Sequence, residues 1–159
     1  YISEIGSDDF YHSGALDQLV EVLDGLEEEY GFVYSSYLAM DANTGKILRQ
    51  VPDPSNTYYQ WIEQPERRLL QNNFVTPPCA MRAELYEEIQ YDVAQEKCED
   101  YLFKLELSCI TNFYKLDGPL ATVRIRSDSI SNDQSPEKQQ QMRRWEEAAR
   151  KKIYERNFV

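Results

Sequence analysis

The hydrophobic pattern becomes regular after the first dozen residues. Its apolar positions, three or four residues apart, are Leu16, Leu19, Val20, Leu23 and Leu26. This spacing predicts an amphipathic helix, with Ser13 as its N-cap and Gly31 as its stop signal. Gly25 lies within the apolar stripe and costs a helix about 1 kcal/mol relative to alanine, so the predicted helix is weakest there.

Two apolar runs, residues 32–40 and 46–51, flank a segment of turn-forming residues at 41–45. Aromatic and β-branched residues dominate the first run. Such runs on either side of a turn predict a β-hairpin, in which Asn43 or Gly45 takes a positive φ angle.

A helical pattern follows at residues 57–71. Its expected buried positions are Tyr58, Ile62, Leu69 and Leu70. Pro65 interrupts the pattern, so we expect a break or two short helices there.

The period changes within residues 79–117, which contain neither glycine nor proline. Apolar residues first recur every four positions, at Met81, Leu85, Ile89 and Val93. This spacing predicts a helix. Residues 103–109 then alternate between apolar and polar, and residues 121–126 do the same after a turn at 117–118, which predicts a second hairpin. The alternative is one helix from 79 to 116, about 55 Å long; the change of period favours a helix followed by a hairpin.

The chain closes with a polar stretch and a helical segment. Residues 127–135 are typical of a linker, and Ser135 before Pro136 fits an N-cap followed by the first helical position. The thin apolar stripe of this basic helix consists of Met142, Trp145, Ala149 and Ile153.

These patterns predict a single α+β domain with two β-hairpins and about three packed helices, plus a C-terminal helical arm. We divide the chain into an N-terminal arm (1–13), the α+β domain (14–126), the polar linker (127–135) and the basic C-terminal helix (136–159). A length of 159 residues suits one domain and is sufficient for a core without disulfides or metal.

Charge is distributed unevenly along the chain. The formal net charge is −11, from 17 Lys and Arg against 28 Asp and Glu. Residues 121–159 nevertheless carry nine bases against six acids. The acidic body excludes nucleic acid as a partner of the whole surface, because phosphate binding needs a positive field. Only the basic C-terminal helix could bind it.

Five acidic residues repeat at steps of four: Glu84, Glu88, Asp92, Glu96 and Asp100. Like charges at this spacing destabilise a helix, so the series is either a solvated face or a surface that binds a cation or a basic protein. Metal is the weakest of these interpretations, because the segment has no histidine and lacks the spacing of an EF-hand. We expect no cofactor and no metal.

Few residues suit catalysis. His12 is the only histidine, while Cys98 and Cys109 lie among core-like residues. The sequence has no nucleophile elbow, no phosphate-binding glycine loop and no dinucleotide fingerprint. An aromatic cluster at Tyr58, Tyr59 and Trp61 has acidic neighbours, which favours core or interface packing over base stacking.

The C-terminal helix is the best candidate for an interaction site. A tryptophan flanked by bases, after a polar linker, is typical of a helix that binds in a groove. The alternative is that it folds back on its own domain, against the acidic series. The candidate interaction residues are Arg143, Arg144, Trp145, Lys151, Lys152, Tyr154, Glu84, Glu88, Asp92 and Glu96.

We therefore expect a non-catalytic accessory or scaffold subunit of a larger protein assembly, which binds protein partners through its C-terminal helix and aromatic surface. One alternative is a small-molecule-sensing regulatory domain, which a pocket with a few convergent polar groups would favour. A second is an enzyme that uses carboxylate or tyrosine acid–base groups, which would need a perturbed acidic pair in a cleft.

The number and spacing of the cysteines indicate the type of cellular compartment. The three cysteines are odd in number and include no Cys-x-x-Cys pair, which suits a reducing intracellular compartment. No apolar run approaches the length of a membrane helix. The first residue is Tyr1, consistent with a cytoplasmic protein fragment or with an organelle protein after removal of a targeting peptide.

Overall fold

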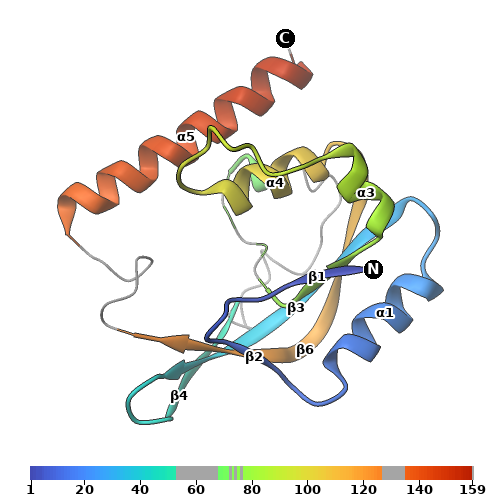
Figure 1. Ribbon diagram of the computed structural model, residues 1–159, viewed down its shortest axis with the longest axis vertical. Helices are drawn as coiled ribbons and strands as arrows, with labels where there is room; N and C mark the ends of the chain where they lie inside the picture. Colours follow the sequence, from blue (N-terminus) through green and yellow to red (C-terminus); the bar gives the residue numbers. More distant parts are fainter. Residues whose placement is uncertain (53–67, 72, 74, 76, 127–134, 159) are drawn as a thin grey trace.

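Two long parallel strands form the centre of the structure. The computed structural model describes residues 1–52, 68–71, 73, 75, 77–126 and 135–158. The strands are β1 (Ile2–Glu4), β2 (Phe10–Tyr11), β3 (Tyr30–Asp41), β4 (Ile47–Val51), β5 (Cys79–Met81) and β6 (Asn112–Ile125). The helices described are α1 (Ala15–Gly25), α3 (Ala83–Glu88), α4 (Glu99–Leu107) and α5 (Pro136–Phe158). Figure 1 shows the single α+β domain that the sequence predicted.

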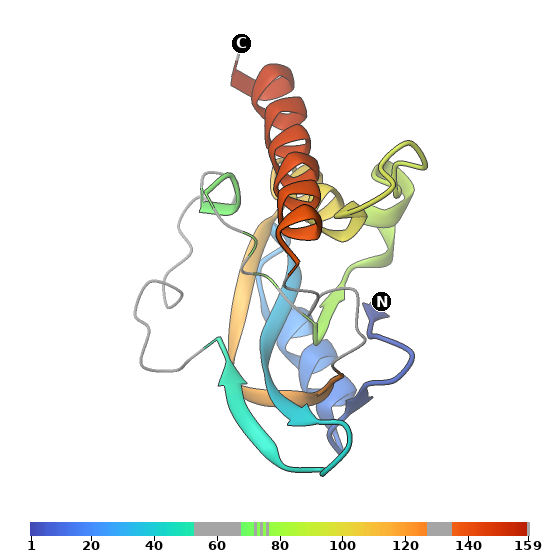
Figure 2. The same ribbon diagram turned by 90° about the vertical axis from the view of Figure 1, so that its left-hand side faces the viewer.

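The sheet is mixed and strongly curled (Figure 2). Its strand order is β1-β5-β3-β6-β2, and β4 pairs with the second half of β3. The parallel register of β3 and β6 runs from Tyr30 opposite Asn112 to Asp41 opposite Ile125, with shifts on both sides of Ser36. Such irregularities bend a strand and increase its twist.

Helices cover both faces of the sheet (Figure 1). On one face α1 buries Leu19 and Leu23 against Val33 of β3. On the other face α4 and α5 pack over Phe32 and Tyr34. Successive strand residues point to opposite faces, so one strand supplies both cores.

The predicted first helix is present, with different ends. Leu19 and Leu23 are buried as expected, although Leu16 is 46 % exposed. The N-cap is Gly14, with φ of 74°, instead of Ser13. The helix ends at Gly25, and Gly31 lies inside β3.

The first predicted hairpin is confirmed as β3 and β4, which pair antiparallel. Asp41 organises the turn, because its Oδ1 accepts hydrogen bonds from the amides of Asn43 (3.0 Å) and Thr44 (2.8 Å). The bonds from Thr44 hold the pKa of the Asp41 carboxyl below its ordinary value. Gly45 takes the positive φ, at 71°.

The N-terminal arm expected for residues 1–13 belongs to the sheet instead. β1 pairs with β5, and β2 pairs with β6, both antiparallel. These strands are two and three residues long, which is too short to give a sequence period. Tertiary pairing alone defines them.

The helix expected from residue 79 is wrong over most of its length. Cys79–Met81 form β5 between β1 and β3, and α3 extends only from Ala83 to Glu88. Val93, expected on the buried stripe, is fully exposed. Sheet pairing on both sides of β5 overrides the local helical pattern.

The second predicted hairpin is also wrong, as is the alternative of one helix from 79 to 116. Residues 103–107 belong to α4, which is buried nearly all round between the sheet and α5. A helix buried on all sides loses its amphipathic period. Asp117 and Gly118 do not reverse the chain, because β6 continues through them beside β3.

The C-terminal helix begins at Pro136, as predicted. Within the helix expected at 57–71, Leu69 is buried, whereas Tyr58, Ile62 and Pro65 lie outside the described residues. Most of the expected linker, 127–134, also lies outside them. In the part of the chain that the structure describes, no helix is long and apolar enough to cross a membrane.

Candidate functional site

The contact between α4 and α5 brings the acidic body and the basic C-terminal helix together. Ala149 and Ile153 of α5 are completely buried in the core that α4 forms with the sheet. Met142 and Trp145 are partly buried against the same core. Trp145, proposed from the sequence as an anchor for a partner, therefore packs on its own domain.

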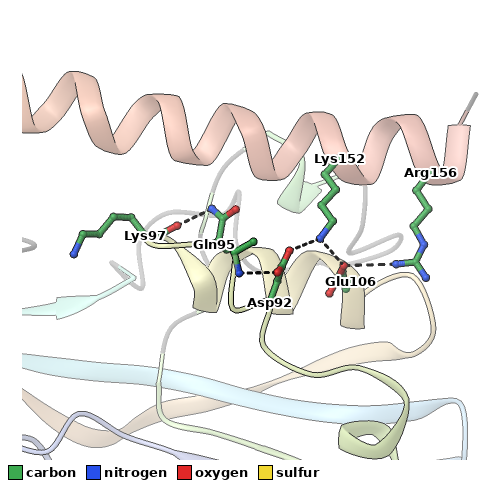
Figure 3. Close-up of polar contacts among 7 residues, drawn as sticks. Asp92, Gln95, Lys97, Glu106, Lys152 and Arg156 are labelled. Carbon is green, nitrogen blue, oxygen red and sulfur yellow. Dashed lines mark hydrogen bonds and ion pairs between the residues drawn. The ribbon is translucent and has the colours of Figure 1, made fainter.

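Ion pairs support this contact (Figure 3). The Lys152 ammonium donates to Asp92, with Nζ 2.7 Å from Oδ2, and lies 3.7 Å from Glu106 Oε1. The Arg156 guanidinium lies 3.6 Å from the same Glu106 oxygen. The hydrogen bond from Lys152 lowers the pKa of Asp92, and the reciprocal bond raises the pKa of Lys152.

The acidic series does not form one face. Glu84 and Glu88 lie on α3, and Asp100 lies on α4. Asp92 and Glu96 lie in the connection between these helices, and among the described residues Asp92 is the one member of the series that forms an ion pair with α5. The five carboxylates are therefore not all aligned along one helix.

A pocket of about 310 Å³ lies beside these ion pairs. Its apolar lining is Ile89, Ile110 and Ile153. Its polar lining is Glu88, Gln90, Glu106, Cys109 and Arg156. The three segments that form it are the end of α3, the end of α4 and the last turns of α5.

The pocket is lined by acidic and basic side chains that differ in their exposure to solvent. The Glu106 side chain is 11 % exposed and lies between two cations, whereas the Arg156 side chain is 68 % exposed. Glu88 is also exposed, and among the described residues it forms no ion pair. Sequence reasoning missed Glu106, because its alternating neighbours placed it on the polar face of a strand.

The outer face of α5, defined here as Arg143, Arg144, Lys151 and Tyr154, points away from α4. All four side chains are exposed. Among the described residues, Lys151 forms one long ion pair, 3.7 Å from Glu155 on the same helix. These four residues belong to the predicted interaction site, which stays a prediction. The aromatic cluster at Tyr58, Tyr59 and Trp61 lies outside the described residues.

The groups weighed for catalysis have structural contacts. His12 contacts β6, with Nδ1 2.9 Å from the Pro119 carbonyl oxygen and Nε2 2.9 Å from Thr122 Oγ1. Tyr91 stacks on Phe103 and donates to Glu4 at 2.5 Å, and its burial raises the pKa of its hydroxyl. Among the described residues, no group of three His, Cys, Asp or Glu could hold a metal ion.

Compared with known proteins, the chain matches no protein-family model and no curated protein sequence. The packing of α5 on α4 leaves two surfaces available for binding, the pocket and the outer face of α5.

Proposed function

We propose that the chain is a non-catalytic accessory or scaffold subunit of a larger protein assembly, and that the outer face of α5 binds its partner. One observation carries this proposal. The helix uses one narrow stripe, with Ala149 and Ile153 at its centre, to dock on its own domain. The opposite stripe presents cations and a tyrosine to solvent.

The chemistry of this face favours an acidic protein surface. Arginine and tyrosine are enriched among the residues that dominate interface energies. Tyr154 is 54 % exposed beside the cations. Glu147 and Glu155 lie on the exposed part of the same helix, and they lower the positive potential that a phosphate backbone would need.

A charge-reversal variant tests the proposal. Arg144→Glu with Lys151→Glu should lower recovery of co-purifying proteins from the native source about tenfold or more, because like charges across an interface cost several kcal/mol. The matched control is Lys46→Glu with Arg49→Glu, which makes the same charge change on β4 and the turn before it. Quantitative mass spectrometry of the purified complexes measures both.

Equal recovery with both variants would contradict the proposal. Loss of recovery after nuclease treatment would instead indicate a nucleic-acid partner. Deletion of residues 136–159 is a poorer test, since it removes Ala149 and Ile153 from the core and so destabilises the domain itself.

A further inference from the structure

The pocket beside α5 has the size of a small-molecule site, with a lining that is more polar than apolar. Its volume of about 310 Å³ lies at the lower end of the range of about 300–1,000 Å³ for ligand pockets. Ile89 and Ile110 supply the accessible apolar wall, because Ile153 is only 1 % exposed, and Glu88, Glu106 and Arg156 also line the pocket. A ligand in this pocket would contact α5 and the ends of α3 and α4. Ligand binding here goes beyond the proposed function as an assembly subunit.

The two exposed charges of the pocket have unused hydrogen-bonding capacity. Arg156 forms one ion pair within the described part of the chain, at 3.6 Å, while a guanidinium has five donors. Glu88 has no ion pair among the described residues. Glu106 is different, because Lys152 and Arg156 already flank its carboxylate.

We propose that this pocket binds a free α-amino acid with an apolar side chain. Arg156 takes the ligand carboxylate, Glu88 takes the ammonium group, and Ile89 and Ile110 contact the side chain. Glu88 would repel a ligand that carries only a carboxylate, and Arg156 would repel a ligand that carries only an amine. A zwitterion satisfies both charges, and the pocket volume suits a molecule of that size.

Isothermal titration calorimetry of the full chain with three probes tests this proposal. L-leucine is the zwitterion, isopentylamine lacks its carboxylate, and 4-methylpentanoate lacks its ammonium group. Leucine should bind about tenfold or more tightly than either analogue, since each lost charge-assisted pair removes at least about 1.4 kcal/mol.

Two variants test which pocket side chain binds each charged group of the ligand. Arg156→Gln should remove the advantage of leucine over isopentylamine, and Glu88→Gln should remove its advantage over 4-methylpentanoate. Arg49→Gln on β4 and Glu147→Gln on α5, both exposed and outside the pocket lining, are the matched controls and should bind leucine as the unaltered chain does. Thermal melting of each variant verifies that it is folded, as expected for exposed side chains.

Three results would overturn the proposal. The first is no saturable binding of leucine or phenylalanine up to about 10 mM, the weak limit for a specific small ligand. The second is equal affinity for leucine and one of its analogues in the unaltered chain. The third is unchanged leucine binding in both pocket variants.

Discussion

At Gly31 the main chain passes too close to its neighbours to accommodate a side chain. A Cβ atom there would lie 2.6 Å from Thr111 Oγ1 and still closer to a methyl group of Leu85. The Gly31 amide donates to the same Thr111 oxygen at 2.6 Å. Gly31 is therefore needed for the close packing at the start of β3. It is not the helix stop signal that the sequence predicted.

Replacing Gly31 by alanine should destabilise the fold by about 1–3 kcal/mol, the usual cost of overpacking. Urea denaturation followed by circular dichroism measures the change. Gly25→Ala is the control, because a Cβ atom at Gly25 meets nothing within 4 Å. It should leave stability unchanged or raise it by up to about 1 kcal/mol. Equal stability of the two variants would refute this account of Gly31.

Lys104 is a buried cation on α4. Its side chain is 3 % exposed, and its Nζ lies 2.9 Å from Asp100 Oδ2 one turn earlier. Its neighbours along the helix, Leu102, Phe103 and Leu105, are buried as well. Such a buried ammonium depends on its partner, because an unpaired buried charge is costly.

Asp100→Asn should therefore destabilise the fold by about 1–3 kcal/mol, the cost of leaving a buried group poorly paired. Adding Lys104→Met should recover part of that loss, since an apolar side chain of similar length then fills the site. Chemical denaturation of the single and double variants gives both values. A double variant less stable than Asp100→Asn would contradict the argument.

At the scale of elements, the connection between α3 and α4 helps to hold α5. Asp92 lies in this connection and accepts hydrogen bonds from Lys152 and from the Ala94 amide. Both bonds lower its pKa from the ordinary value of 3.8. A carboxyl with a lowered pKa stabilises the fold above its ordinary pKa, and that contribution is lost as the pH falls further.

Asp92→Asn should therefore reduce stability at neutral pH and lose that difference as the pH falls below 3.8. Fluorescence of Trp145 in a Trp61→Phe background, followed during urea unfolding at several pH values, measures it. Glu96→Gln is the matched control, because Glu96 lies in the same connection and forms no ion pair among the described residues. A Glu96→Gln variant with the same pH dependence would exclude a specific role for Asp92.

At the scale of the whole molecule, burial separates the three cysteines into two classes. Cys79 and Cys98 are buried, whereas Cys109 is exposed at the pocket, and none forms a disulfide. Burial raises the pKa of the Cys79 thiol to about 11 and that of the Cys98 thiol to about 11. Thiolates are the reactive form, so these two thiols are protected by both burial and protonation.

In the native protein, Cys109 should react with a chromogenic disulfide reagent much faster than Cys79 or Cys98, because its thiol is exposed whereas theirs are buried and have raised pKa values. Absorbance during the reaction, before and after addition of guanidinium chloride, counts the reactive thiols. Cys109→Ser should abolish the fast phase. Fast labelling of Cys79 or Cys98 in the native state would show that this part of the core opens readily.

Local sequence patterns correctly predicted the elements that have their own turn or capping residues. The β3–β4 hairpin has its own turn chemistry at Asp41 and Gly45, and the start of α5 has its own proline signal. The predicted second hairpin failed where burial is nearly complete. In α4, buried Lys104 stands within an apolar run, so polarity no longer reports which side faces solvent.

The sequence by itself determined the α+β class, the first hairpin, the first helix and the basic C-terminal helix, because each depends on residues close together in the chain. Only the tertiary structure decided where α5 docks and that a pocket lies beside it. Glu88, Glu106 and Arg156 line that pocket from three separate segments. No local period links them, since packing of α5 on α4 is what brings them together.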